Sequence, residues 1–460
     1  MIRSAPHRSP PHRSPPRSLL RGALLASLGL GFSAPGAAAE LKFEQYTLEN
    51  GMNVILMPDH SLPQVVVNLW YGVGAKDEVV GRTGFAHLFE HLMFMGTTRL
   101  PDAGFDEKME AVGGWNNAWT SEDATDYFDV GPAHILPLFL WMEADRMDGL
   151  DSAMNEDKLS KQRDVVRNER RQSYEDAPYG EAWLVLPEVM YPPGHPYAHS
   201  VIGSHADLEA AKAADVVDFF NRWYVPNNAS LVVAGDFEPA AARAQIAETF
   251  GVLKARPLPE RAAPVTPDLP QRALTEVTDQ VDLPKTHLLW HSPAALSAGD
   301  APMQFLGAIL ADGRASRLHR RLVQDERIAT EVSAAQLGSL FSGLFLIEAV
   351  PAEGHTVDEL EAAITEELRR LAAEGPTADE LQRNRNQVEL MMLQELEPLQ
   401  GRASALNRYR YHVGRPDYID AHLAAYRGVD AAAVKAAAAT LTVERRAIIR
   451  VRPEPTGGEK

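Results

Sequence analysis

The amino-acid sequence predicts an α+β protein made of two copies of one unit of about 200 residues. Its 460 residues exceed what one ordinary hydrophobic core accommodates, so two or more domains are expected. A predicted helix over 215–224 and strand over 229–234 are matched later by a helix over 430–440 and a strand over 446–451. This repeated helix-then-strand order indicates that the second half resembles the first in outline.

Composition describes an acidic globular chain without thiol chemistry. Hydrophobic residues make up 45% and charged residues 23% of the sequence, which is typical of a globular protein. Cysteine is absent, so disulfides, thiolate metal sites and cysteine nucleophiles are excluded, and any metal must use histidine and carboxylate ligands. A formal net charge of −18 makes the chain a poor nucleic-acid binder.

The first 39 residues differ from the rest of the chain. They contain five arginines and no acidic residue, and they end in the apolar run 22–32 and Ala37-Ala38-Ala39. This pattern predicts a secretory signal peptide over 1–39 and a secreted or periplasmic protein. A transit peptide to an organellar matrix is the alternative, because the segment is also rich in Arg and Ser. No later run reaches the roughly 18 apolar residues of a transmembrane helix.

Strands open the first unit. Two are expected over 41–48 and 53–56, joined by the turn Glu49-Asn50-Gly51. Residues 64–71 form a continuous β-rich run, which is typical of a strand covered on both faces. A helix is then predicted over 84–95, followed by a short one over 105–112.

The helix over 84–95 carries the strongest chemical signal. His87 and His91 are four residues apart and share one face, while Glu90 projects from the adjacent strip. Two neutral imidazoles and a carboxylate suit zinc and leave a fourth position for water, whose proton a nearby carboxylate can accept. The intervening residues are apolar, so a metal would also satisfy polar groups that lie in a buried segment. This His-x-x-Glu-His order is a known catalytic signature.

Two strands are predicted next, over 115–121 and 123–130. They could form a sheet edge near the metal to which a peptide adds as a further strand. They could equally form an ordinary hairpin, and the pattern does not choose between the two.

A third metal ligand is expected from the charged helix predicted over 155–174, which follows another helix over 137–148. Most charges of this helix are explained by a solvated face. The residues alone leave Asp164, Glu169 and Glu175 open as the ligand.

A proline-rich stretch over 253–272 predicts an interdomain linker. The second unit is expected to contain a strand near 286–290 and a helix over 302–310. Capping-box patterns at Thr356 and Thr377 predict the starts of two long helices. The second unit lacks a His-x-x-Glu-His cluster, so only the first is expected to carry the chemistry.

Several motifs in the same order make this chain resemble the pitrilysin/insulinase (inverzincin) family of zinc metallopeptidases, in particular its half-length members related to mitochondrial processing peptidase. The resemblance spans nearly all of the chain after residue 39 and is strongest from Leu48 to Asp236. The motifs are Leu48-Glu49-Asn50-Gly51, the segment 84–96, Gly113-Gly114 with Asn117-Ala118 and Thr120, His195-Pro196-Tyr197 with Gly203, and the segment 224–229.

The resemblance implies a fold and a division of roles. Two homologous domains, each a mainly antiparallel sheet covered by helices, would form a clam-like substrate chamber. They would comprise an N-terminal zinc-binding peptidase domain over 40–252 and a non-catalytic C-terminal domain over 273–455.

The resemblance also implies the site residues. His87, His91 and Glu169 would bind one zinc ion, and Glu90 would be the general base. Asn117 and Ala118 would lie on the edge strand that aligns the substrate.

Two positions depart from the family pattern. Gln162 stands where many relatives have a second glutamate, which affects the surroundings of the site rather than ligation. In the second half, Arg317 matches a substrate-contacting arginine, but Thr330 replaces the tyrosine that usually accompanies it. This difference suggests that a homologous partner chain supplies an Arg/Tyr pair in a heterodimer; a homodimer is the other arrangement considered.

The expected function is that of a zinc endopeptidase acting on oligopeptides or small unfolded polypeptides. A non-catalytic or partner-dependent scaffold subunit of a heteromeric peptidase is the alternative. A zinc hydrolase that acts on other bonds is disfavoured by the peptide-edge motif around Asn117.

Overall fold

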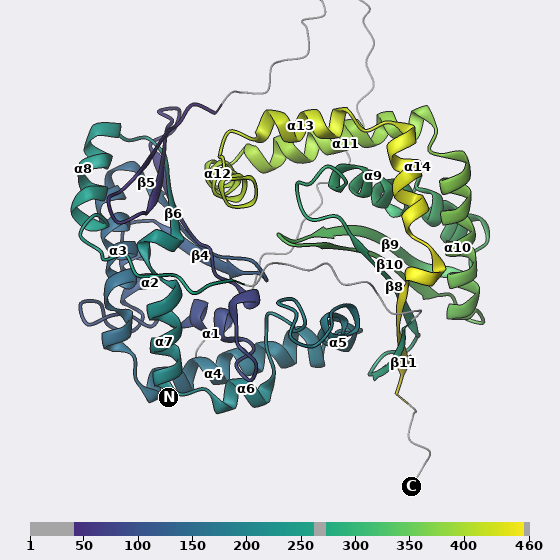
Figure 1. The fold of residues 1–460 in the computed structure, drawn as a ribbon, viewed down its shortest axis with the longest axis horizontal. Helices are drawn as coiled ribbons and strands as arrows, with labels where there is room; N and C mark the ends of the chain where they lie inside the picture. Colours follow the sequence, from purple (N-terminus) through teal and green to yellow (C-terminus); the bar gives the residue numbers. More distant parts are fainter. Residues whose placement is uncertain (1–40, 262–272, 455–460) are drawn as a thin grey trace, which may run out of the picture. The chain divides into compact units, whose positions relative to one another are not determined.

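The computed structural model describes residues 41–261 and 273–454. The predicted signal peptide and residues 262–272 of the predicted linker lie outside the described residues. None of the helices within these two ranges is both long and apolar enough to cross a membrane. Figure 1 shows the two sheets and the helices that cover them.

The first sheet has six strands in the order β1-β2-β6-β3-β5-β4. All neighbours are antiparallel except β2 and β6. The strand β3 is buried at all but its first residue, as its continuous apolar run predicts. The strand β4 lies at the edge and pairs with β5 alone among the described strands. The bounds are β1 Glu44–Thr47, β2 Asn53–Pro58, β3 Gln64–Tyr71, β4 Trp115–Thr120, β5 Thr125–Pro132 and β6 Ala229–Gly235.

The helices of the first half include every one predicted there. The helix expected over 155–174 ends at Arg170 and continues as a π-helical turn, Arg171–Glu175. The bounds are α1 Phe85–Leu92, α2 Gly104–Ala111, α3 Leu136–Ala153, α4 Glu156–Arg170, α5 Glu181–Met190, α6 His205–Ala210, α7 Ala213–Trp223 and α8 Pro239–Thr249.

The second sheet has five strands in the order β7-β11-β8-β10-β9, with β7 and β11 parallel and the other pairs antiparallel. Two sheets of this kind, each with its helices, confirm the predicted α+β fold of two similar halves. The strands are β7 Leu274–Asp279, β8 Lys285–Ser292, β9 Ala329–Gly338, β10 Gly343–Pro351 and β11 Ala447–Pro453. The helices are α9 Asp300–Ala311, α10 Val357–Glu374, α11 Ala378–Leu396, α12 Leu399–Val413, α13 Ile419–Arg427 and α14 Ala431–Thr440.

Both capping boxes form as predicted. Thr356 and Thr377 each accept a hydrogen bond from the backbone of the glutamate three residues later, and each glutamate bonds back to the threonine backbone. These reciprocal bonds satisfy backbone donors at the first turns of α10 and α11.

The two halves exchange one helix each, which the sequence did not predict. The helix α12 packs on β3 and β6 of the first sheet, where Ala403 and Leu406 join a cluster of buried apolar residues (Figure 1). Near the middle of α12, the buried Asn407 donates a hydrogen bond of 2.7 Å to Asn68 Oδ1. In return α5 packs on the second sheet, with Leu186 buried beside strand residues of that half. Each sheet therefore has one face covered by a helix from the other half.

Candidate metal centre and active site

The helix α1 presents two imidazoles on one side because its other side is anchored in the core. Phe89 is fully buried and its ring centroid lies 4.2 Å from that of Tyr224. The opposite face holds His87 and His91, whose ring centroids are 4.8 Å apart. This amphipathic pattern places both histidines one turn apart along the same face.

Glu169 from α4 completes a three-residue cluster. Its Oε2 lies 3.3 Å from His91 Nε2 and 3.7 Å from His87 Nε2. One ligand atom from each residue lies within 4.8 Å of the others, and this is the one such cluster in the part of the chain that the structure describes. Asp164 and Glu175, the other two candidate ligands, lie outside this cluster. Glu175 instead bonds to Arg170 and His205, at 2.9 and 2.8 Å.

The protonation states in this cluster suit a metal. Burial, together with the neighbouring His91, lowers the pKa of His87 to about 4, so its ring is neutral at pH 7. The hydrogen bond from His91 lowers the pKa of the Glu169 carboxyl, which is therefore ionised. Two imidazoles and one carboxylate form a donor set that zinc prefers. These residues fit a zinc ion.

Glu90 lies beside the cluster and is held by the edge strand. Its Oε2 accepts a hydrogen bond of 2.5 Å from the hydroxyl of Thr120, the last residue of β4. Burial raises the pKa of the Glu90 carboxyl above its usual value. A carboxylate with a raised pKa is a stronger base, which suits it to accept a proton from water.

The N-terminus of α1 is fixed by Glu78, which sequence reasoning missed. Its buried carboxylate accepts hydrogen bonds from the backbone N–H groups of Gly84, at 2.9 Å, and Ala86, at 2.7 Å. These donors have no partner within the helix. The available signal was an acidic residue a few positions before a helix start.

A glycine contact links the helices that carry the candidate ligands. Gly84 and Gly203 approach so closely that a Cβ on Gly203 would overlap the backbone of Gly84, and both have positive φ. Arg170, next to Glu169 on α4, donates a hydrogen bond of 2.6 Å to the carbonyl of Gly203. The segment around Gly203 therefore sets the spacing between α1 and α4.

The residues predicted to bind substrate lie in two different parts of the fold. Asn117 and Ala118 are on β4, whose free edge could accept a peptide strand. Ala118 packs on the core around α1, and Asn117 is exposed.

Arg317 lies in the second half of the chain, and its guanidinium already bonds to other residues of the protein. Its guanidinium bonds to Glu380 at 2.7 and 2.8 Å, to Glu367 at 3.4 Å and to the carbonyl of Gly375. Only 10% of its side chain is exposed. A substrate would have to break this bidentate pair to reach it.

Thr330 and Gln162, the two residues that depart from the family pattern, make ordinary contacts. Thr330 lies on β9 and donates a hydrogen bond to the carbonyl of Val350. Gln162 on α4 contacts the sulfur of Met95, just after α1.

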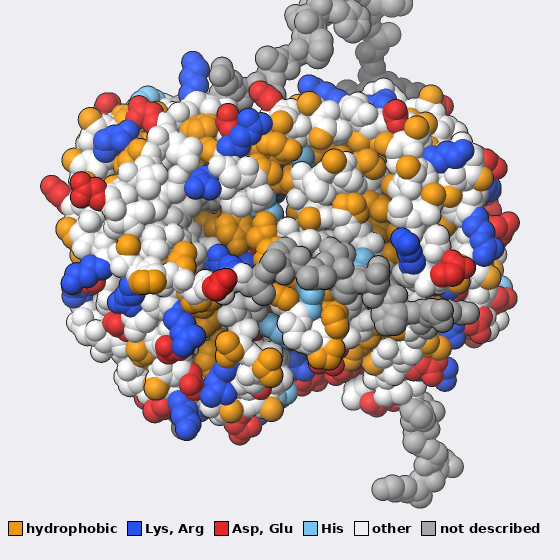
Figure 2. Space-filling view, viewed as in Figure 1, with side chains coloured by type: hydrophobic (Ala, Val, Ile, Leu, Met, Phe, Trp, Pro, Cys, Tyr) orange, Lys and Arg blue, Asp and Glu red, His pale blue; other side chains and the backbone are white. Residues whose placement is uncertain are grey.

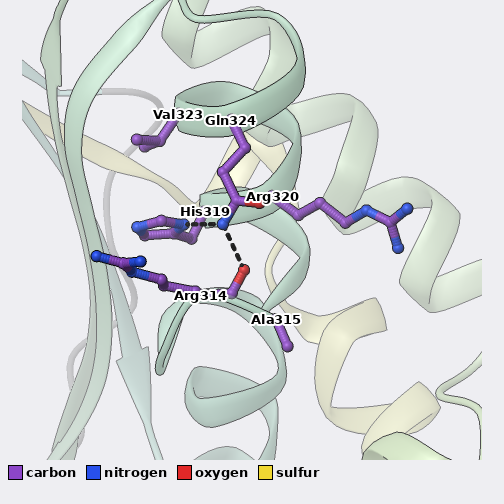
Figure 3. A pocket seen from close by; sticks show the side chains of 6 residues that line it. All are labelled: Arg314, Ala315, His319, Arg320, Val323 and Gln324. Carbon is purple, nitrogen blue, oxygen red and sulfur yellow. Dashed lines mark hydrogen bonds between the residues drawn. The ribbon is translucent and has the colours of Figure 1, made fainter.

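A hollow of about 650 Å³ lies in the second half and is lined by Arg314, His319, Arg320 and three neighbours. Figure 3 shows Gln324 donating hydrogen bonds to His319 and to the carbonyl of Arg314. None of its lining residues is a carboxylate or belongs to the metal cluster. It therefore offers no second metal site.

Figure 2 shows acidic and basic side chains interspersed over the face it displays, so the net negative charge forms no single patch there.

Comparison with known families gives the class of the protein. Residues 53–185 match the family described as Insulinase (Peptidase family M16), and residues 210–388 match the Peptidase M16 inactive domain. The chain belongs to the M16 peptidase family, as a half-length member.

Individual proteins agree with this assignment. Zinc protease PqqE of Helicobacter pylori is 29% identical over 369 residues, covering 79% of this chain and 81% of the relative. The crystal structure of a protease from Helicobacter pylori superimposes with a TM-score of 0.83 at 25% identity, covering 90% of this chain and all of that one. The periplasmic protease PqqL of Escherichia coli has the same fold at 17% identity and a TM-score of 0.72, and 91% of this chain covers 48% of it.

Proposed function

We propose that this protein is a zinc-dependent endopeptidase that hydrolyses peptide bonds in oligopeptides or small unfolded polypeptides. The observation that carries the proposal is the cluster of His87, His91 and Glu169, with Glu90 beside it on α1, the helix that carries both histidines. Its membership of a peptidase family and the zinc protease relatives support the reaction class. The strand β4, which pairs with β5 alone among the described strands, offers an edge that supports a peptide as substrate.

Each residue of the site has a role in this proposal. His87, His91 and Glu169 would hold one zinc ion. When bound, zinc supplies a Lewis acid that polarises a carbonyl and lowers the pKa of water. Glu90 accepts a proton from the attacking water and returns it to the leaving amine, while Thr120 orients its carboxylate. The backbone of β4 around Asn117 and Ala118 aligns the substrate as an added strand.

The alternative is a partner-dependent or non-catalytic subunit. Two observations favour it: the second half matches a family domain described as inactive, and Arg317 is committed to Glu380 while Thr330 replaces a tyrosine. In this version a homologous chain supplies the missing Arg/Tyr pair. The likeness of this chain to about half of PqqL is consistent with two such halves working together. We propose that either version is secreted or periplasmic, on the basis of the signal peptide predicted over residues 1–39.

The test compares the wild type with Glu90→Gln for zinc content and for cleavage of a mixed peptide library. Glu90→Gln keeps the shape and removes the base, so zinc should remain and cleavage should vanish. Glu107→Gln, an exposed glutamate on α2, is the matched control. If zinc is bound but the wild type cleaves nothing even with a homologous chain added, the endopeptidase proposal is wrong and the scaffold function is favoured.

A further inference from the structure

A second cavity, of about 320 Å³, lies at the end of β4 between the two halves of the chain. We call it the β4 pocket and define it by six of its lining residues. Trp70, Trp119 and Glu122 come from the first half, and Glu395, Arg408 and His412 come from α11 and α12.

The β4 pocket lies on the face of β4 that points away from α1. Thr120 bonds to Glu90 on the α1 side, and side chains alternate along a strand. Trp119 accordingly packs on the other face, beside residues of α12. A peptide that pairs with the edge of β4 alternates in the same way. Its side chains on the α12 side would therefore reach the β4 pocket.

The charges around the cavity are unequal. Three carboxyl groups line it, from Glu122, Asp123 and Glu395, against one guanidinium. The Asp123 carboxylate is committed to the Tyr197 hydroxyl and the Leu340 N–H. Glu395 pairs with Arg408 at 2.8 Å.

Glu122 carries the third carboxyl group that lines the cavity, after those of Asp123 and Glu395. The groups acting on it are its own backbone N–H and the like-charged Asp123, and burial raises its pKa. A carboxyl group in this position is stabilised by an incoming cation.

The remaining walls suit a cation as well. Trp70 and Trp119 meet edge to face with ring centroids 4.9 Å apart, and indole rings attract ammonium and guanidinium groups. Burial lowers the pKa of His412, which is therefore neutral and can accept a hydrogen bond. Its Nδ1 is buried and has no hydrogen-bond partner among the described residues.

We propose that the β4 pocket is a specificity site that binds a lysine or arginine side chain of the peptide substrate, with Glu122 as the residue that selects it. The inference rests on the proposed endopeptidase function. It adds a preference that neither the metal cluster nor the edge strand accounts for.

The test measures kcat/KM for peptides that are identical except at one position, which carries Lys, Met, Phe or Glu in turn. Met matches the length of Lys without its charge. The wild type should prefer Lys over Met by at least about tenfold at one position. In Glu122→Gln this ratio should fall about tenfold, and Glu122→Lys should prefer Glu at that position. Glu397→Gln, an exposed glutamate near Glu395 that does not line the cavity, should keep the wild-type ratio.

Two outcomes overturn the inference: a wild type without a preference for Lys at any position, or a Glu122→Gln protein that folds and keeps the preference. Failure of the proposed function is distinguishable, because then no peptide is cleaved. In that case binding of the Lys and Met peptides to Glu90→Gln is measured by calorimetry, with and without Glu122→Gln. Tighter binding of the Lys peptide that Glu122→Gln abolishes supports the pocket, and equal binding overturns it.

Discussion

The hydroxyl of Tyr197 donates a hydrogen bond of 2.5 Å to Asp123 Oδ1 in the turn between β4 and β5. The other carboxylate oxygen of Asp123 accepts from Leu340 N–H in the second half, at 2.7 Å. Its backbone carbonyl accepts from Lys76 and from Tyr411 on α12. One residue next to β4 therefore joins four separate segments of the chain.

Replacing Tyr197 by phenylalanine should weaken this junction. The change removes the bond to Asp123 and the acceptor for Phe341 N–H, leaving buried polar groups without partners. We expect the free energy of unfolding to fall by about 2–3 kcal/mol, measured by urea denaturation. Tyr418→Phe is the control, because Tyr418 stands just before α13 and is only partly buried. A loss no larger than that of the control would contradict the role given to the junction.

The contact between Gly84 and Gly203 predicts a large effect of one methyl group. Gly203→Ala should lower the free energy of unfolding by about 3 kcal/mol or more and weaken zinc binding, because the added Cβ forces α1 and α4 apart. Gly194→Ala is a matched control: its φ is also positive, at 86°, but its Cβ would meet nothing within 4 Å. It should cost about 1 kcal/mol and leave zinc affinity unchanged. Equal losses of zinc affinity in the two variants would refute this explanation.

Acid should destabilise the metal-free protein through His87. Its pKa is about 4 in the folded protein, and the usual value for an unfolded chain is about 6.5. Between these values the unfolded chain binds more protons, so stability is lost as the pH falls through this window. The loss amounts to about 3 kcal/mol at most. Urea titrations from pH 7 to pH 4 measure it, and His87→Gln should remove this part of the pH dependence. An unchanged pH dependence in His87→Gln would show that other groups cause it.

Arg317 can be tested for two distinct roles. If its bonds to Glu380 and Glu367 are structural, Arg317→Lys loses the bidentate pair and lowers the free energy of unfolding by about 2–4 kcal/mol. If it contacts substrate, KM should rise with little change in stability. Arg320→Lys is the control, since Arg320 is 73% exposed and lies 3.7 Å from Asp325. We expect the structural result, measured by denaturation and by steady-state kinetics together.

Local patterns predicted local structure well in this protein. The capping boxes at Thr356 and Thr377 and the helix carrying His87 and His91 depend on residues a few positions apart, and the structure contains all of them. The choice of Glu169 among three carboxylates was different, because it depends on which face of α4 meets α1 across 78 residues of chain after His91. Family resemblance selected it, and spacing alone did not.

Long-range packing was beyond the sequence for the same reason. The bond between Asn407 and Asn68 joins positions 339 residues apart, and neither side chain carries a local signal of its partner. The β4 pocket arises from that same packing, since Trp119 and Arg408 meet only when α12 lies on the first sheet. Such contacts are set by shape and burial in the folded chain rather than by periodicity.

The exchange of α5 and α12 has a consequence for folding. A fragment ending in the predicted linker would contain β3 and β6 without the helix that buries their second face, and the remainder would lack α5. Each fragment would expose a broad apolar surface and be prone to aggregate. The two halves should therefore melt in one cooperative transition. Separately produced halves should become soluble only when mixed, as complementary fragments that restore each other's core.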